Sequence, residues 1–292
     1  VGAFDLGVYK TADGDNEVAN KLANTRINIS LTLTDDVYKE AYVFYLINKY
    51  AKAVSPDGAH RLIVEGHNSG DINFYNEVVR SGTMSQDDIC AANIADLMAA
   101  KSNVWSTRIR DFNDSGAGKI SIRALTLMLK PTFTAVKNTL KANGSKLDPE
   151  TKTYQIIEAY WDALEIIFKD TIFNPLKQKE YGMMKSSQAE VMFKVLKFIC
   201  EVHIKDWVER FNVKEFGDLS DSKTWVKILK KPLNNISDTN PSNTKVKGHE
   251  CWYVGKAGAM GLYTSSAAKR DIAQKLVHEI ETSHGIVRSQ VI

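Results

Sequence analysis

The chain has 292 residues, of which 43% are hydrophobic and 25% are charged. This composition is ordinary for a globular protein with a substantial core, and it excludes a collagen-like or low-complexity chain. The formal net charge of +3 permits contact with nucleic acid, but dedicated DNA-binding domains are usually more basic. No apolar run approaches the roughly 18 residues that a membrane-spanning helix needs. We therefore expect no membrane among the partners.

The three cysteines, Cys90, Cys200 and Cys251, are odd in number and lie far apart. Such a pattern does not suggest a disulfide framework, and free thiols indicate a reducing, cytoplasmic location. His249 lies two residues before Cys251 but lacks two further clustered ligands. The sequence therefore predicts no metal site.

The first organised unit is a strand followed by a helix. Apolar and polar residues alternate strictly over residues 27–33, which is the period of a half-buried strand. Thr34 can then cap a helix whose first turn carries Asp35 and Asp36, favourable at the positive end of a helix dipole. Pro56 cannot continue that helix. The pattern predicts a strand over 27–33 and a helix over 35–53 packed on the same sheet.

This unit resembles the second half of the DGQHR-type domain of the ParB/sulfiredoxin-like superfamily. One branch of that family is the repressor-like B protein of DNA phosphorothioation operons. The resemblance is specific over residues 26–56, where the chain reads Phe44-x-x-Ile47-Asn48-x-x-x-Lys52-x-Val54-Ser55. A second segment, 104–125, is also similar, with an arginine-bearing strand, a glycine turn and the helix start Ile120-Ser121-Ile122-Arg123.

The resemblance implies a partial ParB-like domain over residues 1–66 and a mainly helical domain with a few short strands over 67–292. It implies that Asn48 and Lys52 bind a nucleotide, a nucleoside triphosphate being the expected cofactor if there is one. The family signature would lie before Val1, so we expect the native protein to extend beyond that residue.

Residues 57–61 read Asp-Gly-Ala-His-Arg and could be taken for the signature itself. They depart from it at Ala59, and they follow a helix and a proline rather than a buried strand. A motif counts only in its structural context. We therefore predict a turn and a helix start here, with a functional motif as the alternative, and name no catalytic residue.

Beyond residue 84 most of the chain reads as helix. Residues 84–88, Met-Ser-Gln-Asp-Asp, cap a helix that runs to about residue 100. Residues 105–112 alternate like a strand, and residues 113–118 form a turn. Pro131 is expected to kink or interrupt the next helix. Residues 143–149 form a loop, and a buried helix follows with the apolar positions Ile156, Ile157, Tyr160, Trp161, Leu164, Ile167 and Phe168.

The C-terminal third contains three further predicted helices. Ser187 and Glu190 form the spacing of a capping box. A short basic helix covers residues 224–233, residues 234–248 read as a mobile loop, residues 250–254 suit a strand, and residues 264–266 cap the last helix. The glycine-rich stretch 255–261 lacks the ending of a phosphate-binding loop, so we interpret it as a turn. Phosphate binding at the helix N-terminus of residues 264–266 is the alternative.

Two groups of basic residues could contact phosphates. One surrounds the glycine turn and contains Arg108, Arg110, Lys119 and Arg123. Alternation along the predicted strand would bury Ile109 and expose both neighbouring arginines. The other group lies on the short basic helix and the loop beside it, and contains Lys223, Lys227, Lys230, Lys231, Lys245 and Lys247. Solvated surface cations are the alternative interpretation of both groups.

The sequence thus predicts an α+β protein with a partial ParB-like domain and a mainly α-helical domain. The expected function is that of a DNA-binding accessory or regulatory protein in a DNA-modification or phage-defence system. The predicted interface with duplex DNA is Arg108, Arg110, Lys119 and Arg123, and other proteins of the operon are further expected partners. The alternative is an enzyme, either a nucleotide hydrolase or a DNA-nicking enzyme. Oligomeric state is not predicted.

Overall fold

The structure, a computed structural model, describes residues 64–66, 69–70, 84–110, 120–202, 219–260 and 265–285. The predicted strand over 27–33, the helix over 35–53 and the Asp-Gly-Ala-His-Arg turn at 57–61 lie outside these residues, as do Asn48 and Lys52. No helix in the described ranges is long and apolar enough to cross a membrane.

The described part is mainly helical, with short strands between the helices. The long helices are α5 (Gln86–Lys101), α6 (Ile122–Ala142), α7 (Pro149–Ile167), α8 (Ser186–Val202), α10 (Ser222–Asn235) and α11 (Ser266–His284). The strands are β1 (Ile109–Arg110), β2 (Ile120–Ser121), β3 (Ser237–Thr239) and β4 (Lys245–Lys247). Three short 3₁₀ helices are η2 (Gln178–Glu180), η4 (Gly248–Trp252) and η5 (Gly255–Ala257). This composition agrees with the α+β class at the coarse level.

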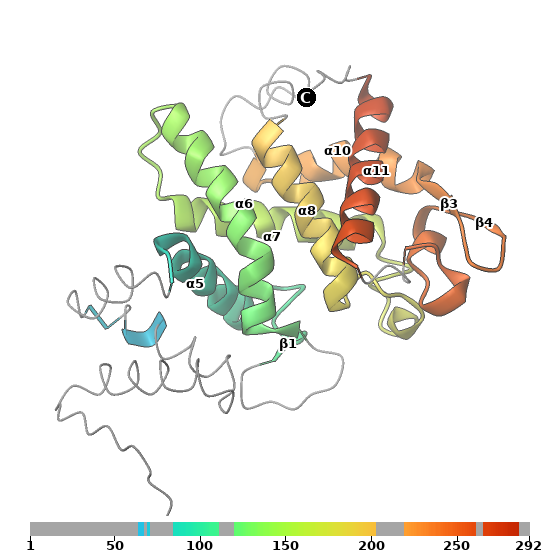
Figure 1. Cartoon of the computed structure of the whole chain (residues 1–292), viewed down its shortest axis with the longest axis horizontal. Helices are drawn as coiled ribbons and strands as arrows, with labels where there is room; N and C mark the ends of the chain where they lie inside the picture. The colour runs from blue at the N-terminus through green and yellow to red at the C-terminus, as the bar shows by residue number, and fades with distance from the viewer. Residues whose placement is uncertain are drawn as a thin grey trace, which may run out of the picture.

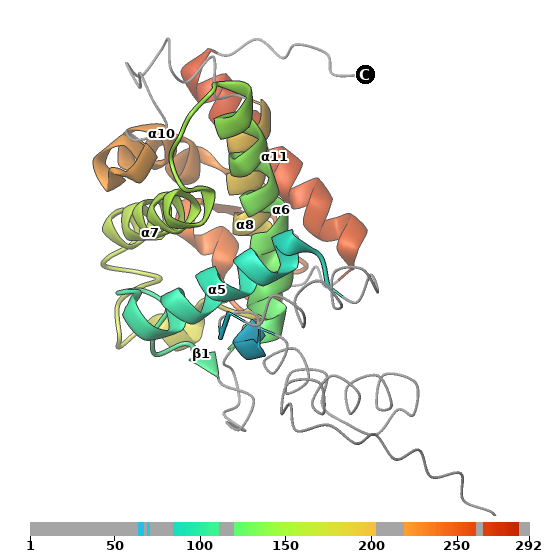
Figure 2. The ribbon, with the colours of Figure 1, turned by 90° about the vertical axis from the view of Figure 1, so that its left-hand side faces the viewer.

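The six long helices form two layers (Figures 1 and 2). In one layer α8 lies between α6 and α11, and in the other α7 lies between α5 and α10. The layers meet where α6 packs on α5 and α7, and where α10 packs on α11. Each helix therefore buries one apolar stripe against the opposite layer, as expected for helices that share one core.

Capping side chains determine where these helices begin. The hydroxyl oxygens of Ser85, Ser121 and Ser265 each accept a hydrogen bond from the backbone N–H three residues later. The carboxylates of Asp148 and Asp221 do the same for the first turns of α7 and α10. Such caps satisfy backbone donors that have no partner inside the helix. The helix starts predicted within 84–88, after the 143–149 loop and at 264–266 are confirmed, with Ser85, Asp148 and Ser265 as the capping residues.

Aromatic side chains fill the centre between the layers. Trp105 and Trp161 meet edge to face with ring centroids 4.8 Å apart, and Tyr160 meets Trp225 in the same way at 5.2 Å. The Tyr160 hydroxyl donates to the Met192 carbonyl at 3.0 Å. The Trp225 indole donates to the Leu219 carbonyl at 2.7 Å. These polar atoms are thereby satisfied inside an apolar core.

Three sequence predictions about strands and loops were wrong. Residues 103–108 form turns, so within the described part of the predicted 105–112 strand, which ends at residue 110, Ile109 and Arg110 alone are extended, and they pair in parallel with Ile120 and Ser121. Residues 234–248 contain an ordered antiparallel hairpin, β3–β4, where a mobile loop was expected. Residues 248–252 form the 3₁₀ helix η4, which includes the start of the predicted 250–254 strand. For β1 and for the β3–β4 hairpin, pairing with another segment decided the structure, and the local pattern does not identify that partner.

Two helix predictions also needed correction. Pro131 lies within α6, which continues without interruption to Ala142. Helix α8 begins at Ser186, so Ser187 lies inside its first turn instead of capping it. Glu190, the expected capping-box partner, forms ion pairs with Lys194 and Lys269.

Candidate nucleic-acid interface

Helix α10 carries a row of four lysines opposite its buried face. Trp225, Ile228 and Leu229 are completely buried, so this side of the helix faces the core. The side chains on the opposite side are exposed, and we call them the α10 lysine row: Lys223, Lys227, Lys230 and Lys231. Positions i, i+4, i+7 and i+8 lie within about 100° of one another on a helix and span about 12 Å along its axis. The row is therefore a continuous cationic ridge.

The α10 lysine row is largely free of internal partners. Within the described residues no ion pair joins Lys223, Lys227 or Lys230 to a carboxylate. Lys231 donates to the Ser283 carbonyl at 3.5 Å, a long contact at the edge of hydrogen-bonding range. These ammonium groups can therefore reach phosphate oxygens without breaking an existing ion pair.

The β3–β4 hairpin adds two lysines immediately after α10. Lys245 and Lys247 are exposed on either side of the buried Val246, as the two-residue period of a strand requires. The hairpin turn is held by Asn240, whose side-chain oxygen accepts the N–H groups of Ser242 and Thr244 at 3.0 and 2.9 Å. The lysines of the hairpin therefore have a defined backbone position.

The predicted arginine interface has a mixed outcome. Ile109 is buried, as predicted. The Arg108 guanidinium, however, donates to the Val104 carbonyl and lies 6.0 Å from the centroid of the Phe173 ring. Burial lowers the pKa of Arg108, and the negative charge of Glu165 offsets part of this effect. Arg108 therefore holds the turn formed by residues 103–108 against the rest of the protein.

The parallel ladder places Arg110 opposite Ser121. Ser121 is the residue before α6, and Arg123 lies in the first turn of that helix. Both arginines are partly exposed. Lys119 lies outside the described residues. Of the four predicted residues, Arg110 and Arg123 are therefore the two that the structure shows to be accessible. Their role in DNA binding stays a prediction.

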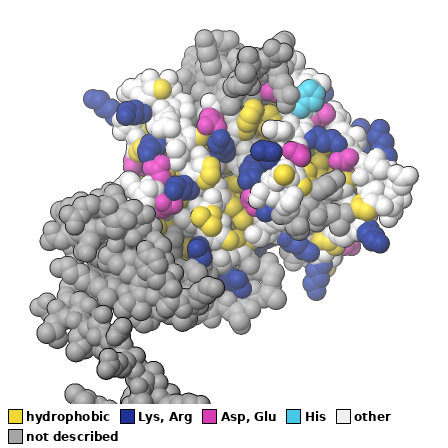
Figure 3. Space-filling view, in the orientation of Figure 1, with side chains coloured by type: hydrophobic (Ala, Val, Ile, Leu, Met, Phe, Trp, Pro, Cys, Tyr) yellow, Lys and Arg dark blue, Asp and Glu magenta, His cyan; other side chains and the backbone are white. Residues whose placement is uncertain are grey.

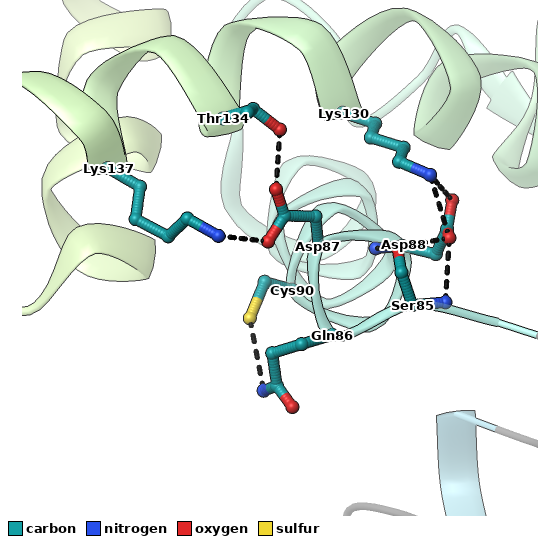
Figure 4. Close-up of polar contacts among 8 residues, drawn as sticks. All are labelled: Ser85, Gln86, Asp87, Asp88, Cys90, Lys130, Thr134 and Lys137. Atoms are coloured by element: carbon teal, nitrogen blue, oxygen red, sulfur yellow. Dashed lines mark hydrogen bonds and ion pairs between the residues drawn. The ribbon is translucent and has the colours of Figure 1, made fainter. Parts of the chain in front are cut away.

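Two further lysines of α6 are already neutralised by α5 (Figure 4). Lys130 forms a 2.8 Å ion pair with Asp88, and Lys137 pairs with Asp87, which also accepts a 2.6 Å hydrogen bond from Thr134. Burial alone would raise the pKa of both carboxyls, but these bonds and charges outweigh it and lower the pKa of each. The two lysines therefore hold α5 on α6 and are not available to a phosphate.

The cysteines do not form a reactive site. Burial raises the pKa of Cys90 to about 11, of Cys200 to about 12 and of Cys251 to about 11. The thiolate is the reactive form, and it is scarce in each case at neutral pH. No group of three or more metal-ligating side chains occurs among the described residues.

The described part of the glycine-rich stretch, residues 255–260, forms a turn, as interpreted from the sequence. Gly255 has a φ of 66° and begins η5, and Gly258 packs directly against the backbone of Tyr253. Residues 261–264 lie outside the described part. Lys256 is exposed in this turn, at some distance in sequence from the helix N-terminus at Ser265.

The lysines of the α10 lysine row belong to the second basic group found in the sequence, whereas the interface predicted from the sequence is formed by the arginines and Lys119. The signal that could have ranked the lysines higher is their spacing, which puts all four on one helical face. No family model, curated protein or solved structure matches the chain.

Proposed function

We propose that the protein is a DNA-binding accessory or regulatory protein that binds duplex DNA through the α10 lysine row. The observation that carries this proposal is the row itself, which consists of four exposed lysines on one face of an anchored helix. A rigid row of cations about 12 Å long suits the phosphates of a duplex, which carries one negative charge per about 1.7 Å of its axis. The exposed lysines of the hairpin would extend the footprint.

The chemistry of the row favours contact with phosphates over the reading of bases. Lysine is a compact point charge, whereas bidentate recognition of guanine or adenine uses arginine, asparagine or glutamine. The exposed ridge of α10 contains lysine alone between Lys223 and Lys231. Binding is therefore expected to depend strongly on salt and hardly at all on sequence.

The resemblance to DGQHR-type proteins supports a wider role in a DNA-modification or phage-defence system. That wider role is part of the proposal, and so is an interaction with other proteins of such an operon. The alternative of a nucleotide hydrolase or nicking enzyme rests on residues outside the described part. An assay of ATP and CTP hydrolysis, run with and without duplex DNA, tests that alternative directly.

The proposal is tested by titrating labelled duplexes of two unrelated sequences over a range of salt concentrations. Wild-type protein should bind both duplexes equally, with log affinity falling by about 0.9 per phosphate contact for each tenfold rise in salt. The triple variant Lys223→Gln, Lys227→Gln, Lys230→Gln should bind both more weakly and flatten that slope by about two to three units.

A matched control removes the same charge elsewhere. The triple variant Lys101→Gln, Lys141→Gln, Lys146→Gln changes three exposed lysines on α5, α6 and the loop after α6. It should keep the wild-type slope. If both triple variants weaken binding equally, net charge and not the α10 lysine row is responsible, and the proposal fails. If only Arg110→Gln with Arg123→Gln weakens binding, the arginine interface predicted from sequence is the correct one.

A further inference from the structure

A groove runs between α6 and α11, with α8 as its floor. Helix α8 packs closely against both neighbours, whereas α6 and α11 make few contacts with each other. The space between them has a volume of about 810 Å³. In Figure 3, hydrophobic side chains gather between these helices and Lys and Arg side chains lie beside them. This arrangement leaves room above α8 for one more element.

Each helix contributes one straight row of side chains to the groove. The α6 wall presents Leu127, Met128 and Pro131, and the α8 floor presents Phe193 and Phe198. The α11 row runs from Ser266 to Val277, which is about three helical turns or 16 Å. A docked helix of about three turns would match this length.

The α6 wall exposes groups that a partner could cover. The Leu127 side chain is 61% exposed at the edge of the groove. Pro131 has no N–H, so the carbonyl of Leu127, four residues earlier, cannot receive its usual helical hydrogen bond. An apolar side chain and an open backbone acceptor therefore lie at the same position.

The charge of the groove is predominantly positive. Its lining contains three cations, Lys194, Lys197 and Arg270, and one carboxylate, Glu190. Glu190 is already paired with Lys194 and with Lys269. Lys197 pairs with Glu201 one turn further along α8. Arg270 has no ion-pair partner within the described residues.

We propose that this groove binds an acidic amphipathic helix of a partner protein. Apolar side chains of that helix, spaced at i, i+3, i+4 and i+7, would lie on Leu127 and on the partly exposed Phe198, as in other helix-in-groove interfaces. Its carboxylates would face Lys194, Lys197 and Arg270. The positive rim favours an acidic over a basic helix because like charges across an interface are strongly unfavourable.

The test uses fluorescein-labelled peptide probes of about 15 residues with leucines at that spacing. One probe carries glutamates on its outer face, the second carries lysines there, and the third is a scrambled form of the acidic probe. The acidic probe should bind at least about tenfold more tightly than either of the others. Its affinity should fall with salt, since part of the attraction is between exposed charges.

Variants then locate the binding site. Leu127→Asp should weaken the acidic probe by at least about tenfold, because it places a charge on an apolar anchor. Ile166→Asp is the matched control, since Ile166 is 55% exposed on α7 and does not line the groove. Arg270→Glu should reduce the preference for the acidic over the basic probe. Both groove variants change exposed or rim positions, and circular dichroism should match the wild type.

Three outcomes would overturn the proposal. The first is that no probe binds, or that acidic and basic probes bind equally. The second is that Leu127→Asp and Ile166→Asp have the same effect. The third is that sedimentation shows a self-associating wild-type protein that Leu127→Asp converts to a monomer, which would make a second copy of the chain the occupant.

Discussion

The carboxylates of Asp87 and Asp88 show how single residues hold two helices together. Both lie in the first turn of α5, where negative charge is favourable. Asp88 also completes a capping box with Ser85, since it accepts the Ser85 N–H at 2.9 Å. The same two carboxylates reach across to Lys130 and Lys137 of α6. One short polar segment therefore both begins α5 and fixes its position.

The variant Asp87→Asn should lower the free energy of unfolding at pH 7 by about 1 kcal/mol, because a hydrogen-bonded ion pair becomes a neutral contact. The pKa of Asp87 is lower in the folded protein than in the unfolded chain. Its contribution is therefore present above the unfolded pKa of about 3.9 and is lost as pH falls through the folded pKa.

Urea unfolding of wild type and variant between pH 7 and pH 3 measures this difference. The difference in free energy of unfolding between wild type and Asp87→Asn should be largest near neutral pH. It should begin to disappear below about pH 4. The control Asp170→Asn removes an exposed carboxylate after α7 and should change stability by less than about 0.5 kcal/mol. A gap for Asp87→Asn that is constant with pH would contradict the ion pair.

The segment from η4 to Met260 shows how a loop becomes an element of defined shape. The Val254 N–H donates to the Glu180 carbonyl at 2.8 Å, and the Gly182 N–H donates to the Trp252 carbonyl at 2.8 Å. The rings of Tyr181 and Tyr253 stack with centroids 4.9 Å apart. Two loops about seventy residues apart in sequence are thereby joined by an antiparallel bridge between Tyr181 and Tyr253, so the extended pairing begins only after η4 has ended at Trp252.

Gly258→Ala should disrupt this segment. A Cβ atom at Gly258 would lie 2.0 Å from the carbonyl oxygen of Tyr253, a backbone atom that cannot rotate away. We expect a loss of more than about 2 kcal/mol in the free energy of unfolding. Gly255→Ala is the control, since its φ is 66° but no atom lies near the new Cβ, and it should cost only about 1 kcal/mol. Equal losses would show that the close approach is unimportant.

At the scale of the whole molecule, all six long helices of the described part contribute to one continuous core. Trp161 on α7 contacts both Trp105 and Phe193, which belong to other segments. Cys200 on α8 and Cys251 in η4 are both completely buried in this core. Their thiols are therefore natural reporters of opening at two separate places.

We expect Cys200 and Cys251 to become reactive together. Pulse labelling with a thiol reagent across a urea gradient should give the same midpoint for both, because one core unfolds as one cooperative unit. Trp161→Phe removes part of that core and should shift both midpoints downward by the same amount. A Cys251 midpoint well below that of Cys200 would mean that the segment around η4 opens separately.

The sequence by itself determined the helices of the described part. Ser85, Asp148 and Ser265 are local caps, and apolar residues at helical spacing identify the buried faces, so neighbouring residues are sufficient for the prediction. The same reasoning recovers the α10 lysine row, since four lysines at i, i+4, i+7 and i+8 must share a face.

Only the tertiary structure decided features that depend on distant residues. The pairing of Ile109 with Ile120, the use of Arg108 as an anchor on Val104 and Phe173, and the β3–β4 hairpin all require contacts that short-range periodicity does not encode. The groove between α6 and α11 is the clearest case. Leu127 and Arg270 are 143 positions apart in the chain, and they line one groove because both helices pack on α8 and hardly on each other.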